Sequence, residues 1–189
     1  MRIGFFGGAF NPPTIAHFDL AKNAIENYSF DKIYFVPVNN FYHKQELIDI
    51  KQRIDMLQIM CSKVNNIYVS EVEKENNRLF KAHEIFKLIE NKYSKDDVYF
   101  LMGEDNFEKM PKWENYEQLK QYKYLVFQRK EEPLQVKKEN IIYMKNKNTL
   151  NICSTEIRNK IKEKEKIDNL VTKEVQEYIQ KNHLYTIKP

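Results

Sequence analysis

Cysteine, glycine and tryptophan are scarce in this chain of 189 residues, which has two cysteines, four glycines and one tryptophan. Cys61 and Cys153 form neither a C-x-x-C motif nor a metal-binding spacing, so we expect two reduced thiols in a cytoplasmic protein. Glycine- and serine-rich linkers, repeats and low-complexity segments are also lacking, which predicts one domain over residues 1–189. Because 42% of the residues are hydrophobic, we expect a sizeable core.

Long apolar runs and strong charge of one sign are lacking as well. No run approaches the length of a membrane span, and the first residues do not have the layout of a signal peptide, so we expect no membrane partner. The formal net charge is only +4, from 31 basic and 27 acidic residues. In the lysine-rich residues 160–166 acids alternate with the lysines, which is typical of a solvated helix face. No basic motif interleaved with aromatic residues is present, so we expect no nucleic-acid partner.

Short apolar segments alternate with longer amphipathic ones along the chain. The short segments suit strands buried on both faces of a parallel sheet, and the helices between them complete βαβ units. Right-handed crossovers then predict a doubly wound, Rossmann-like α/β sheet with helices on both faces. The expected strands are residues 2–6, 32–37, 67–71, 98–102, 124–128 and 141–143, and the expected helices are residues 16–26, 47–61, 81–91, 116–121, 155–164 and 173–181. The last two helices would form a C-terminal segment, at about 154–182, packed on the same domain.

One segment, GFFGGAFNPPTIAHFDLA at residues 4–21, joins the first expected strand to the first expected helix. Gly7 and Gly8 carry no Cβ, so the backbone there can turn sharply and approach an anion closely. Two prolines stiffen the loop, and Thr14 is placed to cap a helix whose free N–H groups attract phosphate. His17 follows three residues later, so both side chains can face one pocket. The segment matches neither the G-x-G-x-x-G fingerprint nor the P-loop pattern.

Each element of this segment, taken alone, is also explained by structure: a plain turn, a helix cap, or a histidine of the surface or core. Their order along the chain is much rarer than the parts. It resembles the (H/T)-x-G-H signature of the nucleotidyltransferase superfamily, with Ala16 in place of the glycine. Members of that superfamily move a nucleotidyl group from a nucleoside triphosphate to an acceptor that carries a phosphate.

Further segments extend the resemblance to the bacterial nicotinate mononucleotide adenylyltransferases. Residues 35–37 (FVP) and 42–44 (YHK) resemble the F-x-P and P-H-K motifs of that family. Residues 102–106 (MGEDN), followed by Trp113, resemble its G-x-D-N…W segment, in which the aspartate serves the nucleotide ribose and the tryptophan borders the pyridine ring. As the only tryptophan, Trp113 suits stacking on an aromatic base, although a place at the edge of the core would explain it equally.

The C-terminal part continues the resemblance. Residues 152–158 (ICSTEIR) match the I-S-S-T-x-I-R motif with Cys153 for the first serine, and residues 171–185 resemble the closing helix of the family. Two hydroxyls at a helix start, followed by an arginine, can hold phosphate oxygens, although a Ser-Thr pair there is ordinarily only a cap. One motif is missing, because residues 76–83 (NNRLFKAH) lack the S-Y-T triplet that contacts the pyridine carboxylate. Arg78 or Lys81 would have to supply that contact.

The residues and the resemblance together predict a site. Catalytic roles are expected for His17, Thr14 and Arg158. The ATP-binding residues are expected to be Gly7, Gly8, Ala9, Phe10, Thr14, His17, Gly103, Asp105, Ser154, Thr155 and Arg158, and the acceptor-binding residues Asn39, Lys44, Trp113 and Arg129. Mg²⁺ is expected to arrive on the triphosphate, without a cage of protein carboxylates.

The reaction implied is adenylyl transfer from ATP to nicotinate mononucleotide, giving nicotinate adenine dinucleotide and pyrophosphate in NAD biosynthesis. Two alternatives stay open from the sequence. The acceptor could be another phosphorylated compound, nicotinamide mononucleotide first or a pantetheine phosphate or cytidylyl acceptor. With Ala16 and Cys153 departing from the motifs, the chain could also be a nucleotide-binding regulator without activity. The sequence does not determine whether the chain forms a homo-oligomer.

Overall fold

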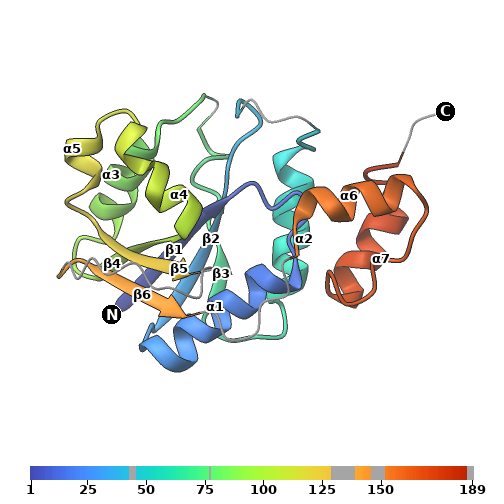
Figure 1. The fold of residues 1–189 in the computed structure, drawn as a ribbon, viewed down its shortest axis with the longest axis horizontal. Coiled ribbons are helices and arrows are strands. Elements are labelled where there is room, and N and C mark those ends of the chain that lie inside the picture. The colour runs from blue at the N-terminus through green and yellow to red at the C-terminus, as the bar shows by residue number, and fades with distance from the viewer. Residues whose placement is uncertain (43–45, 77, 129–138, 146–151, 187–189) are drawn as a thin grey trace.

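A computed structural model of the chain describes residues 1–42, 46–76, 78–128, 139–145 and 152–186. The expected alternation of strands and helices is confirmed (Figure 1). The elements are β1 (Arg2–Gly8), α1 (Ile15–Tyr28), β2 (Lys32–Pro37), α2 (Ile50–Cys61), β3 (Ile67–Val69), α3 (Ala82–Lys92), β4 (Asp97–Gly103), α4 (Glu104–Lys109), the 3₁₀ turn η1 (Met110–Lys112), α5 (Tyr116–Leu119), β5 (Lys123–Gln128), β6 (Ile141–Lys145), α6 (Ser154–Lys162) and α7 (Lys173–Lys181).

The strands of the described residues form one parallel six-stranded sheet in the order β3-β2-β1-β4-β5-β6. This is the doubly wound, Rossmann-like order that the sequence predicts. The chain runs outward from β1 in one direction and, after crossing over, outward from β4 in the other. Ligands of such sheets bind beyond the carboxyl ends of the strands at this switch point. The carboxyl end of β1 is Gly8 and that of β4 is Gly103, so both glycine-containing motifs lie there.

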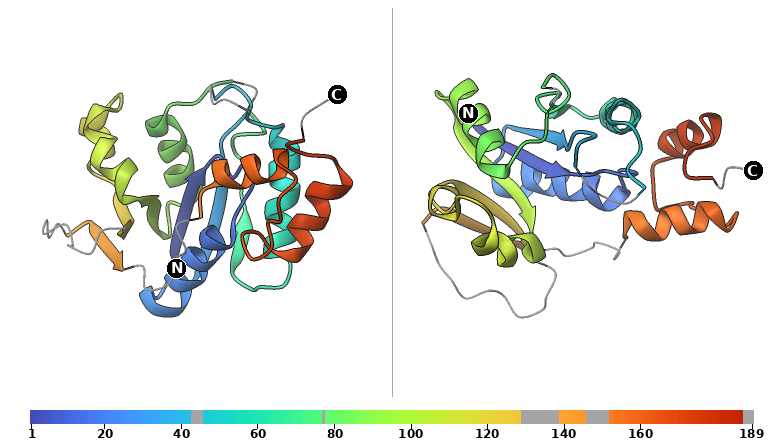
Figure 2. Two further views of the ribbon diagram at one scale, coloured as in Figure 1. Left: turned by 45° about the vertical axis from the view of Figure 1, so that its right-hand side comes forward. Right: turned by 90° about the horizontal axis from the view of Figure 1, so that it is seen from above.

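Strand β1 divides two hydrophobic cores, because alternate side chains of a strand point to opposite faces. Phe6 belongs to the core that includes buried residues of α1, α2 and α7. Ile3 and Phe5 belong to the other core, with buried residues of α3, η1 and α5. Figure 1 shows α3, α4 and α5 gathered at one side of the molecule and α2, α6 and α7 at the other, and Figure 2 shows the same arrangement from two further directions. The helices therefore cover both faces, as expected.

The C-terminal helices join the first of these cores. Ile157 of α6 and Val175 of α7 are fully buried in it, together with Ala24 of α1. The Tyr178 hydroxyl of α7 donates to Asp55 Oδ2 of α2 at 2.8 Å, and Ile15 N at the start of α1 donates to the carbonyl oxygen of Leu170 at 3.0 Å. The segment that carries the Ser-Thr motif is thus fixed against the start of α1. No helix among the described residues has the length and apolar character needed to span a membrane.

The loop after β1 differs from the expectation. The strand continues through Gly7 and Gly8, and no described glycine has a positive φ. The left-handed residue is instead Phe10, with a φ of 48°. A Cβ on Gly8 would lie 2.9 Å from Cζ of Phe10, so this glycine makes room for a ring that folds back over the strand. The prediction of a sharp turn at the glycines was wrong, and close approach of the backbone to an anion stays a prediction.

Two other differences concern helices. Helix α2 begins at Ile50 instead of residue 47, because Asp49 caps it by accepting a hydrogen bond from Lys51 N at 2.7 Å. Helix α4 and the η1 turn were not expected between β4 and α5. They have six and three residues, too few for a helical period to be recognised in the sequence.

Candidate active site

Thr14 and His17 form a closed pair of hydrogen bonds at the start of α1. Thr14 Oγ1 accepts from His17 N at 3.3 Å, and Thr14 N donates to His17 Nδ1 at 3.1 Å. Thr14 Oγ1 also lies 2.8 Å from Nδ1. A backbone N–H can only donate, so Nδ1 is an acceptor and the proton of the neutral ring sits on Nε2. The sequence spacing thus produces a histidine held in the tautomer whose Nε2 is a donor.

Aromatic rings fix the plane of the His17 imidazole. Its centroid lies 5.1 Å from that of Phe10, with the two rings nearly perpendicular, and 5.9 Å from that of Phe6. Phe10 is 2% exposed and packs on Phe6 and Phe35 as well, whereas His17 is half-buried. The side chain of Phe10, expected at the ATP site, therefore lies in the core beneath the histidine and orients it.

The start of α6 is tied to the loop before α1. Ser154 Oγ donates to the carbonyl oxygen of Pro12 at 2.9 Å, and Arg158 Nη1 donates to that of Asn11 at 3.0 Å. These contacts join residues 142 and 147 positions apart in the sequence. The two expected phosphate motifs, each at the start of a helix, are therefore brought together.

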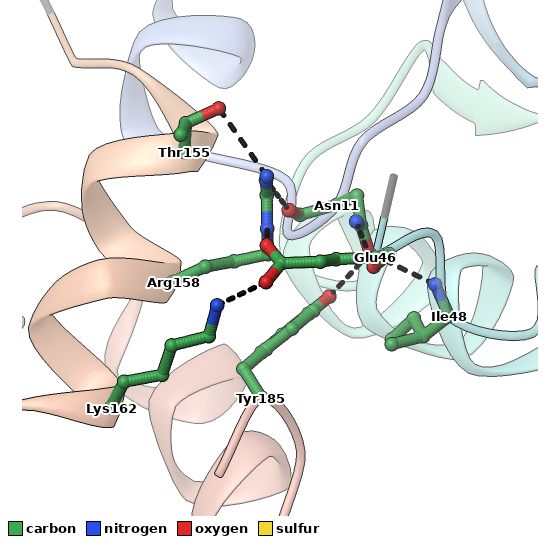
Figure 3. A network of polar contacts seen from close by, with 7 residues as sticks. All are labelled: Asn11, Glu46, Ile48, Thr155, Arg158, Lys162 and Tyr185. Atoms are coloured by element: carbon green, nitrogen blue, oxygen red, sulfur yellow. Dashed lines mark hydrogen bonds and ion pairs between the residues drawn. The ribbon is translucent and has the colours of Figure 1, made fainter. Parts of the chain in front are cut away.

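Arg158 is nearly enclosed, with 7% of its side chain exposed. Besides Asn11, its guanidinium donates to Thr155 Oγ1 at 3.4 Å and, through Nε, to Glu46 Oε2 at 3.1 Å. Lys162 Nζ binds the other oxygen of the same carboxylate. Figure 3 shows Glu46 between the two cations, with Asn11 and Tyr185 beside it. The sequence did not indicate Glu46 or Lys162.

Cys153 precedes these hydroxyls. Partial burial raises the pKa of its thiol, but hydrogen bonds from the Thr155 backbone N–H and hydroxyl and from Glu156 N–H, with the charge of Arg158, bring the pKa below its ordinary value. Cys61 is buried in the core, and burial raises the pKa of its thiol to about 12. Both thiols are free, as expected.

A second buried arginine, Arg53, binds the backbone of the loop after β1. Arg53 of α2 is 0% exposed and donates to the carbonyl oxygens of Ile48 at 2.9 Å and Ala9 at 3.0 Å, and to Asn40 Oδ1 at 3.4 Å. Burial lowers the pKa of its guanidinium to about 10. The backbone of Ala9, an expected ATP-binding residue, is thereby fixed. The sequence did not indicate this role of Arg53. The feature that could have shown it is a single arginine on the face of α2 that otherwise carries apolar residues.

Asn39, an expected acceptor-binding residue, connects two loops beyond the strand ends. Its N–H donates to Glu73 Oε2 at 2.9 Å, its Oδ1 accepts from Phe41 N at 3.0 Å, and its Nδ2 donates to the carbonyl oxygen of Arg78. Burial raises the pKa of the Glu73 carboxyl to about 6, against the smaller lowering effects of Asn39 and Arg53. Both groups of the Asn39 amide thus have protein partners and fix the backbone around it.

Trp113 lies beside the segment that lacks the S-Y-T triplet. Its neighbours reach the start of α3, since Lys81 Nζ lies 3.3 Å from Glu114 Oε2 and Asn115 Nδ2 lies 2.9 Å from His83 Nε2. The tryptophan is half-buried against the second core, so both interpretations of it are compatible with its position. Arg78 Nη1 donates to Glu84 at 2.7 Å, so both cations suggested for a carboxylate contact have carboxylate partners.

The remaining expected residues fall into two groups. Gly103 precedes α4 as its N-cap, and Asp105 is exposed in the first turn of that helix, next to the carboxyl end of β4. Lys44 and Arg129 lie outside the described residues. Among the described residues, no group of three or more His, Cys, Asp or Glu side chains is arranged to hold a metal ion.

Comparison with known proteins identifies the family. The sequence model of the cytidylyltransferase-like family matches residues 5–160. A Fusobacterium nucleatum protein described as "Probable nicotinate-nucleotide adenylyltransferase" is 36% identical over 197 residues, covering 97% of this chain and 100% of that protein. A Borrelia turicatae protein with the same description is 33% identical over 187 residues, 98% of each chain. The chain belongs to the nicotinate-nucleotide adenylyltransferase family. It is therefore a nucleotidyltransferase, as the resemblance implied.

Solved structures agree on the fold of this adenylyltransferase family. The nicotinic acid mononucleotide adenylyltransferase of Plasmodium falciparum, complexed with NaAD, superposes with a TM-score of 0.83 over 97% of each chain at 18% identity. The same enzyme complexed with APC gives a TM-score of 0.82 at 17% identity. At these identities the similarity concerns the Rossmann-like fold, and the family assignment rests on the sequence relatives.

Proposed function

We propose that the chain transfers the adenylyl group of ATP to nicotinate mononucleotide, with Thr14, His17, Ser154, Thr155 and Arg158 as the residues that bind the triphosphate. An oxygen of the mononucleotide phosphate bonds to the α-phosphorus, the bond from that phosphorus to the β-phosphate oxygen breaks, and pyrophosphate leaves. The product is nicotinate adenine dinucleotide, an intermediate of NAD biosynthesis. The observation that carries the proposal is the joining of the two helix N-termini through Ser154, Arg158 and the loop of Asn11 and Pro12.

His17 is assigned to the α-phosphate. Its Nδ1 accepts from Thr14 N, so Nε2–H is the ring donor that we assign to an α-phosphate oxygen. The attacking phosphate is already an anion, so no general base is required, and catalysis comes from in-line placement and from stabilising charge on the α-phosphoryl oxygens. A donor that is held by hydrogen bonds before ATP arrives needs little reorganisation during the reaction.

The β- and γ-phosphates are assigned to the start of α6. The hydroxyls of Ser154 and Thr155 are assigned to phosphate oxygens, in exchange for their present partners, and Arg158 supplies a positive charge close to them. Gly7, Gly8 and Ala9 are assigned to a close approach of the backbone to the nucleotide, and Gly103 and Asp105, at the carboxyl end of β4, are assigned to the ribose. Mg²⁺ would enter as part of the substrate MgATP, held by phosphate oxygens and water.

The acceptor is assigned to the loops that meet around residues 78–83. Asn39 fixes the backbone there, and Trp113 is proposed to border the pyridine ring. Lys44 and Arg129 remain assigned to the acceptor phosphate from the sequence alone. The similarity to nicotinate-nucleotide adenylyltransferases supports nicotinate mononucleotide over its amide, and the complexes of the Plasmodium enzyme with NaAD and APC support ATP as the other substrate.

Domain organisation and location belong to the same proposal. Residues 1–189 are proposed to form one domain, because α6 and α7 complete the core of the N-terminal helices. The two free cysteines support a reducing compartment, for which we propose the cytoplasm. A homo-oligomer is compatible with the proposal and not needed for it.

The experiment is pyrophosphate release with MgATP and a panel of acceptors: nicotinate mononucleotide, nicotinamide mononucleotide and phosphopantetheine, with CTP as an alternative donor. We expect turnover with ATP and the pyridine mononucleotides, with nicotinate adenine dinucleotide identified by chromatography as the product of the first. Release with phosphopantetheine or with CTP alone would show another member of the superfamily. Binding of ATP without turnover on any acceptor would favour the regulator.

Alkylation of Cys153 tests the ATP site independently of turnover. Its lowered pKa and exposed position should make it react with iodoacetamide, whereas Cys61 serves as an internal control that is buried in the core. We expect MgATP to slow alkylation of Cys153 while leaving Cys61 unmodified, as measured by peptide mass spectrometry. An unchanged rate at saturating MgATP would place the triphosphate elsewhere.

A further inference from the structure

Two cations lie four residues apart on α6, next to the proposed triphosphate site. Arg158 has 7% of its side chain exposed and Lys162 has 32%. Like charges at this spacing on a helix repel each other, so an anion between them stabilises the pair. In the structure that anion is the carboxylate of Glu46, which binds Nε of Arg158 with Oε2 and Nζ of Lys162 with Oε1 (Figure 3).

The remaining donors of Arg158 point to the phosphate motifs. Nη1 donates to the carbonyl oxygen of Asn11 and Nη2 to the hydroxyl of Thr155. Both of these partners are neutral, and both belong to the segments assigned to ATP. Among the described residues, Glu46 is the only carboxylate that pairs with this guanidinium. The anion site of the cation pair is thus filled by a side chain of the protein itself.

The Glu46 side chain is free to leave without disturbing the backbone that carries it. Its side chain is 44% exposed, and it belongs to the loop before α2. Its carbonyl oxygen is held separately, by Asn11 Nδ2 at 2.8 Å. Hydrogen bonds from Lys162 and Arg158 lower the pKa of the carboxyl, so it is ionised at neutral pH. Its pairing with Lys162 is exposed on both sides, with 32% and 44% of the two side chains accessible, and exposed ion pairs exchange partners readily.

Building on the proposed function, we propose that the Glu46 carboxylate occupies the place where the terminal phosphates of ATP bind, that Lys162 is a further phosphate-binding residue, and that Glu46 competes with ATP. A phosphate oxygen offers arginine and lysine the same charge-assisted hydrogen bonds as a carboxylate. A terminal phosphate group also carries more negative charge than a carboxylate. The Glu46 carboxylate keeps Arg158 and Lys162 oriented before ATP binds. It also weakens the apparent affinity for ATP, because ATP binds only to the fraction of molecules in which Glu46 has left the site.

The competition predicts an effect opposite in sign to that of a merely structural contact. Glu46→Gln keeps the size of the side chain and removes its charge. If Glu46 competes, the variant binds ATP more tightly, by roughly three- to tenfold, because the occupied fraction of the site falls. If Glu46 only braces α6 against the loop, the variant binds ATP equally well or more weakly. Lys162→Ala should weaken ATP binding by a similar factor.

Isothermal titration calorimetry with MgATP and with AMP tests this directly. AMP lacks the β- and γ-phosphates, so its affinity should be unchanged in Glu46→Gln and in Lys162→Ala. The matched controls are Glu165→Gln and Lys160→Ala, which break a second ion pair of the same segment, 2.8 Å long, and should leave both affinities unchanged. In the double variant Glu46→Gln/Lys162→Ala, the gain from removing Glu46 should shrink, because a shared partner couples the two changes.

Tighter binding of ATP by Glu46→Gln, with AMP unchanged, supports the competition. Unchanged or weaker ATP binding by that variant, in a protein that does bind ATP, overturns this inference and leaves the proposed function intact. An equal gain for ATP and AMP also overturns it, because the effect would not involve the terminal phosphates. Failure of the unmodified chain to bind MgATP at all overturns the proposed function, and with it this inference.

Discussion

Polar groups are held differently on two sides of the candidate site. The phosphate side consists of the residues proposed to bind the triphosphate, Thr14, His17, Ser154, Thr155 and Arg158. The acceptor side consists of the residues proposed to bind the acceptor, Asn39, Trp113, Arg78 and Lys81. On the phosphate side, Thr14 is 0% exposed and binds the His17 ring, and Arg158, with 7% of its side chain exposed, binds the backbone carbonyl oxygen of Asn11. On the acceptor side, Arg78 and Lys81 have 55% and 54% of their side chains exposed and pair with other exposed side chains. Buried groups with fixed partners are costly to rearrange, whereas exposed ion pairs contribute about 0–1 kcal/mol and exchange easily.

This difference indicates that the two sides of the site are prepared for their ligands in different ways. The phosphate side is formed before ATP binds, because helix N-termini, a fixed histidine tautomer and two buried arginines require the fold itself. The acceptor side presents side chains that can leave their present partners when the pyridine carboxylate arrives. In the proposed function, the chemistry of adenylyl transfer therefore depends on the fold, and the choice of acceptor depends on a few exposed residues.

The largest expected effect is on the phosphate side. His17→Ala should lower kcat at least about a hundredfold with the fold intact, because a preformed donor to the developing charge is lost. Steady-state pyrophosphate release and thermal unfolding check this, with the exposed His183→Asn as the matched control. A His17→Ala enzyme with near-normal kcat would remove the main support for a preformed catalytic donor.

Arg158→Lys should raise the KM for ATP about tenfold or more. Lysine keeps the charge but cannot reach Asn11, Thr155 and a phosphate at once, as the planar guanidinium can. Arg2→Lys, at the amino ends of the strands, is the control and should leave the KM unchanged. Tolerance of Arg158→Lys would mean that the phosphate side is as adaptable as the acceptor side.

Trp113→Ala should raise the KM for nicotinate mononucleotide roughly five- to tenfold, with a smaller effect on the KM for ATP, since stacking on an aromatic ring is lost. Trp113→Phe keeps an aromatic ring, so its KM for nicotinate mononucleotide should lie between those of the unmodified enzyme and Trp113→Ala. Nicotinate mononucleotide should also quench the emission of this single tryptophan. Equal effects of Trp113→Ala on the KM values for both substrates, together with an unchanged tryptophan emission spectrum, would show that Trp113 only packs at the edge of the core.

The smallest expected effect concerns stability. The Glu73 pKa is raised from 4.5 to about 6, so the folded protein holds this proton more tightly than the unfolded chain does. Its contribution therefore makes the free energy of unfolding fall, by up to about 2 kcal/mol, as the pH rises from 4.5 to above 6. Glu73→Gln should abolish this fall while still accepting from Asn39 N. Urea unfolding of both proteins at pH 4.5 and 7.5 checks it, and a constant difference between them would contradict the assignment.

The sequence predicts the fold and the two helix starts of the proposed phosphate side well because both depend on local rules. Alternating apolar segments, a Thr-x-x-His helix start and a Ser-Thr-x-x-Arg helix start are recognisable without knowing the neighbours. Arg53 and Glu46 were not identified because their roles depend on carbonyl oxygens and cations far away in the sequence. Helix α4 was missed because six residues are too few to show a period.

The acceptor side was harder to predict for a physical reason. The segment around Arg78 and Lys81 lacks the familiar triplet, and any cation there can serve as an ion-pair partner or as a ligand contact. The structure shows Glu84 and Glu114 as their partners without ligand. Exposed side chains that exchange partners leave no pattern in the sequence from which the acceptor could be deduced.

The most direct test of this account compares kcat/KM for nicotinate and nicotinamide mononucleotide at saturating MgATP. The two acceptors differ by one negative charge on the ring substituent. Recognition of that charge by Arg78, Lys81 or backbone N–H groups should favour the nicotinate roughly ten- to a hundredfold, the effect of a hydrogen bond to a charged group. Equal values, or a preference for the amide, would contradict the assignment of nicotinate mononucleotide as the acceptor.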